Sequence, residues 1–272
     1  MPNILEQIVA DKQKQLERDK SRRPIEDLAE LARSMPRCRN FFKAVTKPNA
    51  RGLNVIAEVK KASPSAGVIR ADFDAASIAR TYERCGAEAI SVLTDEKYFQ
   101  GGIEHLRAVK QSVSLPVIRK DFIIDPWQVY ESRVEGADAV LLIAEAVKIG
   151  RLSDLMILAS ELTLTILLEV HTADALLSVR SLIGFPKKGY SILGINNRDL
   201  STMAVDINTT CRLCELVDGG VPFVSESGID SRGDVEKLMR CGVSAVLVGE
   251  VLCASKTIEE KFRELFARGG RS

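Results

Sequence analysis

The chain lacks the features that mark nucleic-acid-binding, membrane and secreted proteins. Its 38 lysines and arginines are balanced by 37 aspartates and glutamates, so there is no basic excess of the kind that general binders of nucleic acid or membrane surfaces carry. No apolar run reaches the roughly 18 residues of a membrane span. The charged segment 1–20 has no apolar signal core. We therefore expect a cytoplasmic protein with no nucleic-acid partner and no membrane partner.

Cysteine is also sparse. Six cysteines are scattered along the chain, and the only close pair, Cys211 and Cys214, lies in a predicted helix with no second such pair and no nearby histidine. A zinc site would need those further ligands. We therefore expect no metal site and interpret the cysteines as small buried residues in a reducing compartment.

Regular structure begins after residue 52. Apolar runs typical of buried strands lie at 53–59, 88–93, 115–120, 138–143, 164–170, 190–195, 221–225 and 244–249. Between them the sequence predicts helices at 74–85, 102–111, 126–135, 151–161, 173–182, 208–217 and 231–241. Strands that alternate with helices form a parallel sheet, and strands that are apolar throughout are covered on both faces.

The strand-and-helix unit repeats. Gly86, Gly136 and Gly242 each stand where a helix would end, and each is followed by a small residue and a strand. Eight such units predict an α/β fold of the (β/α)8 TIM-barrel type. The alternative is an open doubly wound sheet, but no Gly-x-Gly-x-x-Gly follows the first strand. Because such a barrel often takes about 250 residues as one domain, we expect one domain over residues 1–272.

The first 52 residues form an N-terminal helical extension of this barrel. Helical spacing covers the first 33 or so residues, and Pro24 can open a second short helix there. We expect the charge run at 11–20 to be a solvated helix face. Residues 34–52 are expected to be a connector, and at least one of its adjacent aromatic residues, Phe41 and Phe42, should dock on the barrel.

Charged residues stand where the predicted strands end, which is where such barrels build their active sites. Glu58 and Lys60 follow the first strand two residues apart and so project to the same side. Lys120 ends the third strand and Glu169 ends the fifth. Each lysine could be an acid, a Schiff-base nucleophile or a phosphate partner, and each glutamate a base or a counter-charge. The alternative, a structural ion network, is less favoured because two such pairs face one cavity.

The ends of the last two strands suggest a phosphate site. Ser227-Gly228 and Gly249-Glu250 each place a glycine where the strand hands over to a loop, so that backbone N–H groups can approach an anion. The alternative is that both glycines only make tight turns. His171 lies just beyond Glu169, and we expect its side chain to point to the opposite side, in a structural role.

At these residues the sequence resembles the indole-3-glycerol phosphate synthase family of tryptophan biosynthesis. The resemblance covers nearly the whole chain, including the helical extension. It is carried by ordered motifs at 55–65, 91–102, 120–122, 168–171, 194–200 and 225–229.

The resemblance implies a carboxy-lyase that acts without a cofactor. Its small-molecule substrate is 1-(2-carboxyphenylamino)-1-deoxyribulose 5-phosphate, which loses carbon dioxide and water as the five-membered ring of indole closes. Association with other tryptophan-pathway enzymes is left open. The alternatives are another phosphosugar barrel, such as phosphoribosylanthranilate isomerase or a Schiff-base aldolase, and a non-catalytic barrel that binds a partner.

The resemblance also implies catalytic roles. Lys120 is the general acid at the ketone oxygen, and Glu169 assists proton removal and stabilises the cationic intermediate. Glu58 and Lys60 serve the dehydration, and Lys60 also reaches the phosphate. Asn196 positions the substrate and the lysines.

Further residues are implied to bind the substrate: Ser63, Phe99, Phe122, Arg198, Glu226, Ser227, Gly228 and Gly249. The two phenylalanines would wall the anthranilate ring, and Ser227 and the two glycines would hold phosphate. Ser63 lies in the first loop, which we expect to be mobile and lid-like. The sequence departs from the family at Glu250-Val251, where many members carry a serine, and we expect Glu250 to turn away from the anion.

Overall fold

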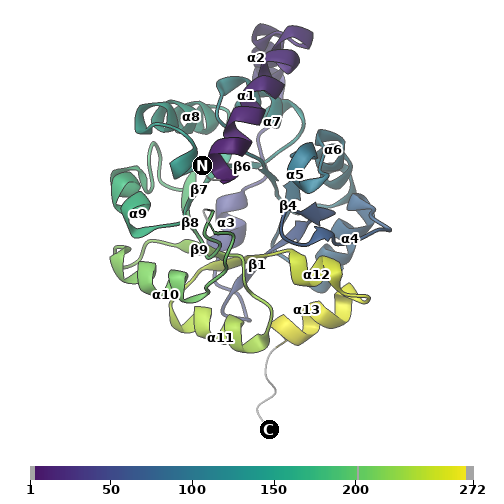
Figure 1. Ribbon diagram of the computed structural model, residues 1–272, viewed down its shortest axis with the longest axis vertical. Coiled ribbons are helices and arrows are strands. Elements are labelled where there is room, and N and C mark those ends of the chain that lie inside the picture. Colours follow the sequence, from purple (N-terminus) through teal and green to yellow (C-terminus); the bar gives the residue numbers. More distant parts are fainter. Residues whose placement is uncertain (1–3, 201, 268–272) are drawn as a thin grey trace.

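Eight parallel strands close into a barrel in the computed structural model, which describes residues 4–200 and 202–267 (Figure 1). The strands follow the order β1-β10-β9-β8-β7-β6-β5-β4 around the barrel. Their bounds are β1 Asn54–Val59, β4 Ala89–Leu93, β5 Val117–Lys120, β6 Ala139–Ile143, β7 Thr165–Val170, β8 Ser191–Asn196, β9 Phe223–Glu226 and β10 Ala245–Val248. The predicted (β/α)8 barrel is confirmed, and every predicted strand lies within two residues of an observed one.

Helices surround the barrel on the outside. The helices predicted between strands correspond to α4 Ala75–Cys85, α6 Ile103–Ser112, α7 Pro126–Val134, α8 Ile149–Glu161, α9 Ala173–Val179, α10 Asn208–Leu213 and α11 Arg232–Arg240. Two of them are prolonged by 3-10 turns, η2 Arg180–Leu182 and η3 Cys214–Leu216. Short elements that were not predicted are the antiparallel pair β2 Ala62–Ser63 and β3 Gly67–Val68, then α5 Glu96–Phe99, η1 Ala144–Ala146, α12 Glu250–Ala254 and α13 Ile258–Phe266.

The strand pleat sorts side chains between two apolar cores. Val55, Ala57 and Val59 of β1 pack outward with the helices, whereas Ile56 points into the barrel. Successive side chains of a strand point to opposite faces, so Glu58 lies on the inner side above Ile56. Charged side chains thus top an interior that is otherwise apolar.

The N-terminal extension forms three helices that contact both ends of the barrel. They are α1 Ile4–Arg22, α2 Ile25–Ser34 and α3 Phe41–Thr46. The first turns of α1 lie over the mouth, where Leu5 and Ile8 join the interior apolar core, and α2 packs on α7. No helix in the described part of the chain is long and apolar enough to cross a membrane.

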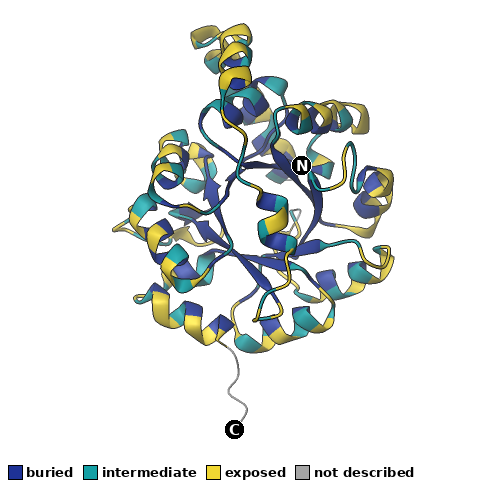
Figure 2. Cartoon of the chain, turned by 180° about the vertical axis from the view of Figure 1, so that it is seen from behind, coloured by how far each residue is buried: buried dark blue, intermediate teal, exposed yellow. Residues whose placement is uncertain are grey.

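The helix α3 lies across the opposite end of the barrel, where it is seen in the opening (Figure 2). Phe41 is fully buried there and Phe42 partly, which confirms that one of the two docks on the barrel. The connector 34–52 was not expected to contain a helix. Asn40 starts it by accepting a hydrogen bond from the backbone N–H of Lys43, 2.8 Å away.

Candidate active site

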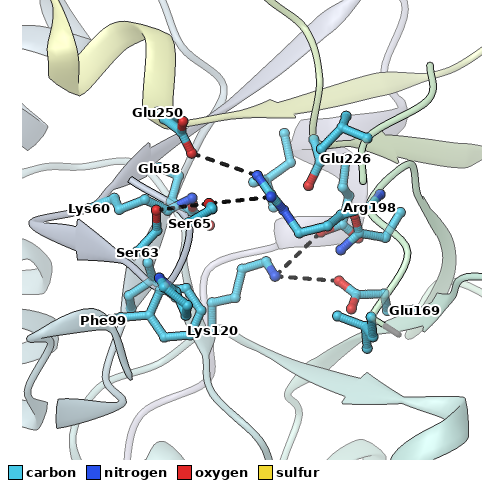
Figure 3. Close-up of a pocket in the computed structure, with 18 of the residues that line it drawn as sticks. Glu58, Lys60, Ser63, Ser65, Phe99, Lys120, Glu169, Arg198, Glu226 and Glu250 are labelled. Atoms are coloured by element: carbon cyan, nitrogen blue, oxygen red, sulfur yellow. Dashed lines mark hydrogen bonds and ion pairs between the residues drawn. The ribbon is translucent and has the colours of Figure 1, made fainter. Parts of the chain in front are cut away.

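A cavity of about 220 Å³ opens at the C-terminal ends of the strands (Figure 3). It brings together every residue that the sequence nominated for the site: Glu58, Lys60, Ser63, Phe99, Lys120, Phe122, Glu169, Asn196, Arg198, Glu226, Ser227, Gly228 and Gly249. These residues come from seven strand ends and the segments that follow them, because the closed parallel barrel turns all those ends to one side.

The first strand contributes an ion pair, as its spacing predicted. Lys60 Nζ lies 2.7 Å from Glu58 Oε1, and the other oxygen of Glu58 accepts a hydrogen bond from Ser91 at 3.2 Å. Burial opposes ionisation of Glu58, but the positive charges of Lys60 and Lys120 outweigh it and lower the pKa of this carboxyl. The pair therefore supplies an anion and a cation side by side.

Lys120 reaches across the mouth from β5 towards β7 and β9. Its Nζ lies 3.3 Å from Glu169 Oε2 and 3.6 Å from Glu226 Oε2, with 16% of the side chain exposed (Figure 3). Burial disfavours the ammonium ion, but the carboxylates of Glu169 and Glu226 outweigh burial and raise the pKa of Lys120. Lys120 therefore holds its proton at neutral pH, as a proton donor must.

Glu169 and Glu226 are both buried carboxyls, but their surroundings shift their pKa values in opposite directions. For Glu226, burial and then the negative charge of Glu169 raise the pKa well above its ordinary value. For Glu169, burial is outweighed by Lys120 and His171, and the pKa is lowered. Among the described residues, neither oxygen of Glu226 accepts a hydrogen bond. The surroundings therefore favour the ionised form of Glu169 and shift Glu226 towards its protonated form, next to one ammonium ion.

His171 lies in this charge network, which corrects the expectation that it points away. Its Nε2 is 3.1 Å from Glu169 Oε1, and its Nδ1 is 3.3 Å from Glu145 Oε2. Residues two apart along a strand share a face, so the end of β7 directs His171 to the side of Glu169. Burial favours the neutral ring, but the two carboxylates outweigh it and raise the pKa of His171 to about 10. No sequence pattern pointed to Glu145, which lies in the turn η1, an element that was not predicted.

The backbone geometry explains why glycine stands at the ends of both β9 and β10. Gly228 has φ +71°, and a Cβ there would lie 2.4 Å from Val205 Cγ1. A Cβ on Gly249 would lie 2.8 Å from Glu58 Oε1. Gly249 therefore lets β10 approach the Glu58 carboxylate closely. The structure supports the tight-turn alternative for Gly228, and phosphate binding at both positions stays a prediction.

Arg198 connects three loops above the cavity. Its guanidinium donates to Ser65 Oγ at 3.3 Å and to the Met203 carbonyl at 3.2 Å, and it lies 3.7 Å from Glu250 Oε2 (Figure 3). Glu250 lines the cavity and faces Arg198, and its orientation relative to a phosphate stays a prediction. The attraction of the guanidinium for a carboxylate explains its direction.

Apolar side chains form the remaining wall. The rings of Phe99 and Phe122 lie 6.3 Å apart between centroids, tilted by 32°. Ile4 and Ile8 of α1 also line the cavity, which the sequence alone did not suggest. Their helical spacing predicts an apolar helix face but not what that face covers.

A second charge cluster lies behind Lys120. Lys12 of α1 is 2.8 Å from both Asp95 and Asp121, with only 3% of its side chain exposed. Arg119 binds Asp121 at 3.0 Å and Glu131 at 2.7 Å. Burial raises the pKa of Asp121, but Lys12 and Arg119 outweigh it and lower that pKa. The charge run 11–20 was expected to be a solvated helix face. For Lys12 this expectation is wrong, because its side chain is buried.

The part of the chain that the structure describes contains no group of three or more histidine, cysteine, aspartate or glutamate residues that could hold a metal ion.

Comparison with known proteins shows which protein family this chain is similar to. The family model described as indole-3-glycerol phosphate synthase matches residues 5–265. The indole-3-glycerol phosphate synthase of Dehalococcoides mccartyi (strain CBDB1) is 46% identical over 266 residues, covering 96% of this chain and 99% of that protein. The enzyme of the same name from Geobacillus kaustophilus (strain HTA426) is 46% identical over 263 residues, covering 97% and 96%.

Solved structures show the same fold at low sequence identity. A thiamine phosphate pyrophosphorylase from Pyrococcus furiosus has a TM-score of 0.57 and 17% identity, covering 80% of this chain and 96% of that one. A mutant tryptophan synthase alpha-subunit from the same organism has a TM-score of 0.57 and 12% identity, covering 78% and 97%. At these identities the likeness shows a shared barrel fold.

Proposed function

The chain belongs to the indole-3-glycerol phosphate synthase family, and from this premise we propose how its cavity carries out the family's reaction. The substrate is 1-(2-carboxyphenylamino)-1-deoxyribulose 5-phosphate, and the products are indole-3-glycerol phosphate, carbon dioxide and water, which makes the enzyme a carboxy-lyase. The observation that carries the proposal is the position of Lys120 Nζ, 3.3 Å from Glu169 and 3.6 Å from Glu226.

Lys120 begins the reaction as general acid. As the ring carbon that bears the carboxylate attacks the ketone, negative charge develops on the ketone oxygen, and a positioned ammonium ion can protonate it. The carboxylates around Lys120 keep it charged until that moment. Glu169, the ionised member of its carboxyl pair, stabilises the cationic ring that the attack produces.

Decarboxylation follows beside the apolar wall. A carboxylate that leaves water for apolar surroundings loses solvation, which favours its departure as neutral carbon dioxide. Phe99 and Phe122 provide those surroundings together with Ile8 of the N-terminal helix. We assign the anthranilate ring to this wall.

Dehydration is assigned to the ion pair of β1. Removing water across a C–C bond needs an acid for the leaving hydroxyl and a base for the proton. Lys60 and Glu58, 2.7 Å apart, offer both. Asn196, whose side-chain oxygen accepts a hydrogen bond from the backbone N–H of Arg198 at 3.0 Å, positions the substrate between the two lysines.

The phosphate is assigned to the side of the cavity formed by β9, β10 and the first loop. Ser227, Gly228 and Gly249 offer backbone N–H groups there, and Ser63 and Lys60 border the same region. Arg198 and Glu226 line the cavity between the phosphate region and Lys120. Because Glu250 pairs with Arg198, an arriving phosphate competes with this carboxylate for the guanidinium.

The proposal extends to the whole chain. It includes one domain over residues 1–272, a small-molecule substrate without a nucleic-acid partner, and a cytoplasmic location. These parts rest on the family's place in amino-acid biosynthesis and on the near balance of charge.

Turnover by the purified protein tests the proposal. Incubation with the carboxyphenylamino substrate should produce the ultraviolet absorbance and fluorescence of an indole, with one carbon dioxide released per indole formed. Folded protein that gives no indole would overturn the assignment. Lys120→Ala tests the general acid: activity retained within about tenfold would exclude Lys120 from that role. Borohydride should trap no covalent adduct, which separates this enzyme from a Schiff-base aldolase.

A further inference from the structure

Three cysteines gather outside the barrel, between α10 and α11. Cys211 lies in α10, Cys214 begins η3 directly after it, and Cys241 follows the last residue of α11. The Sγ atoms of Cys211 and Cys241 are 2.6 Å apart. This separation is already near the S–S bond length of about 2.05 Å, so little movement separates the two thiols from a disulfide.

Access to this pair differs from what the sequence suggested. Of the six cysteines only Cys253 is buried, and the expectation of buried cysteines is wrong for the other five. Cys211 and Cys241 are half-buried. A small oxidant can therefore reach them from solvent.

The third thiol, Cys214, lies beside this pair. Cys214 directs its Sγ to the carbonyl oxygen of Cys211, 3.2 Å away, at the end of its own helix. Cys214 also neighbours the Cys241 thiol, but the sulfur–sulfur contact of 2.6 Å favours Cys211 as the partner of Cys241.

We propose that Cys211 and Cys241 form a reversible disulfide when the protein meets a peroxide. The Cys211 thiolate attacks one peroxide oxygen, so that an S–O bond forms, the O–O bond breaks and hydroxide leaves. The Cys241 sulfur then attacks the Cys211 sulfur, loses its proton and displaces the second oxygen as water. In total, two thiols and one hydrogen peroxide give one disulfide and two waters.

The environment of Cys241 sets the order of these steps. Burial, together with the neighbouring thiol of Cys211, raises the pKa of Cys241 to about 12. Because the thiolate is the nucleophile, Cys241 is the poorer first attacker and serves as the resolving thiol.

The cross-link would join a helix that anchors the cavity. Thr210, the residue before Cys211, donates from its backbone N–H to Asn197 Oδ1 at 3.0 Å. Asn197 in turn donates to the carbonyl of Ser227 at 3.0 Å. The disulfide would therefore tie α11 to the start of the chain of hydrogen bonds that holds the end of β9.

Thiol counting and peptide mapping test the proposal. The full chain, reduced and freed of reductant, is treated with stoichiometric hydrogen peroxide, and free thiols are counted in denaturant. We expect the count to fall from six to four and to return to six with dithiothreitol. A count that stays at six, or that does not recover, overturns the proposal.

Mapping identifies the partners. Trypsin cuts at Arg212 and so separates Cys211 from Cys214, and the linked peptides should be 199–212 and 241–256. Because 241–256 also holds Cys253, fragmentation must place the bond on Cys241. Cys211→Ser and Cys241→Ser should each abolish the linked product, whereas the matched control Cys214→Ser should retain it. A bond that maps to Cys214 or Cys253 contradicts the proposal.

Discussion

Lys120 and its two chain neighbours, Arg119 and Asp121, belong to two charge clusters that differ in how completely their buried carboxyl groups are paired. The mouth cluster consists of Lys120, Glu58, Lys60, Glu169 and Glu226, and the outer cluster consists of Lys12, Asp95, Arg119, Asp121 and Glu131. The strand pleat sends Lys120 inward and Arg119 outward, so one short strand feeds both clusters.

The clusters differ in how fully their carboxylates are paired. Asp121 meets Lys12 with one oxygen, and Arg119 and Thr94 with the other, at 2.7–3.0 Å. Glu226, just as buried, has no hydrogen-bond donor among the described residues, and Lys120 is 3.6 Å away. Their pKa shifts are accordingly opposite, downward for Asp121 and upward for Glu226. A fully paired cluster holds structure together, whereas an incompletely paired one is left to interact with a substrate.

The largest expected effect is on activity, in the mouth cluster. Glu169→Gln should lower kcat by about 10²–10⁴-fold, because it removes a charged group that acts on the reacting atoms. Glu131→Gln in the outer cluster is the matched control and should leave kcat within about threefold. Indole fluorescence gives both rates, and equal losses in the two variants would remove the distinction between the clusters.

The next effect is on stability, in the outer cluster. Lys12→Met leaves Asp95 and Asp121 without their shared cation and should lower the free energy of unfolding by about 3–5 kcal/mol. Lys14→Met changes an exposed lysine of the same helix and should cost no more than about 0.5 kcal/mol. Urea unfolding followed by circular dichroism compares them. Similar midpoints for the two variants would show that the buried pairs contribute nothing.

A smaller, pH-dependent effect is expected at His171, which adjoins the mouth cluster. Its pKa is raised from 6.5 to about 10 in the folded chain by Glu145 and Glu169. The stabilisation is fully present below pH 6.5 and is lost as the pH rises through 10. The full shift corresponds to about 5 kcal/mol at 1.36 kcal/mol per unit, and we expect roughly half because Glu145 is partly exposed.

Urea unfolding of the wild type and of His171→Gln at pH 6 and pH 10 measures this linkage. The stability difference between the two proteins should shrink at the higher pH. A difference that is constant or grows would mean that His171 is neutral in the folded chain.

The smallest effect is expected outside both clusters. Arg212 and Asp206 form an ion pair of 2.9 Å with both side chains largely exposed. Arg212→Ala should change the free energy of unfolding by less than about 1 kcal/mol and leave kcat unaltered. A larger loss in urea unfolding would show that an exposed ion pair can stabilise the fold as much as a buried one. Burial would then not explain the contribution of the outer cluster.

The barrel and the positions of the mouth residues could be predicted because both follow from local patterns. Apolar runs mark strands that are covered on both faces, and a closed parallel barrel turns the residues after them to one side. Glu58 and Lys60 could be placed on the same side because side chains two residues apart along a strand share a face. The helix α3 was missed because six residues give too little periodicity to stand out.

The remaining errors concern contacts between distant segments. The burial of Lys12 depends on Asp95, which follows β4, and on Asp121, which follows β5. No local pattern in the charged helix α1 reveals these distant partners. The pairing of Glu250 with Arg198 on another loop could not be read from a local pattern either. His171 is different, since the period of two that placed Glu58 and Lys60 also places it beside Glu169.

The two clusters are compared most directly by kcat of Lys120→Met and of Lys12→Met, which make the same substitution at one lysine of each cluster. Both proteins are assayed with the carboxyphenylamino substrate at a temperature where circular dichroism shows them folded. We expect a loss of at least about 100-fold for Lys120→Met and of less than about tenfold for Lys12→Met. Equal losses, or a Lys120→Met enzyme within tenfold of the wild type, would contradict this expectation.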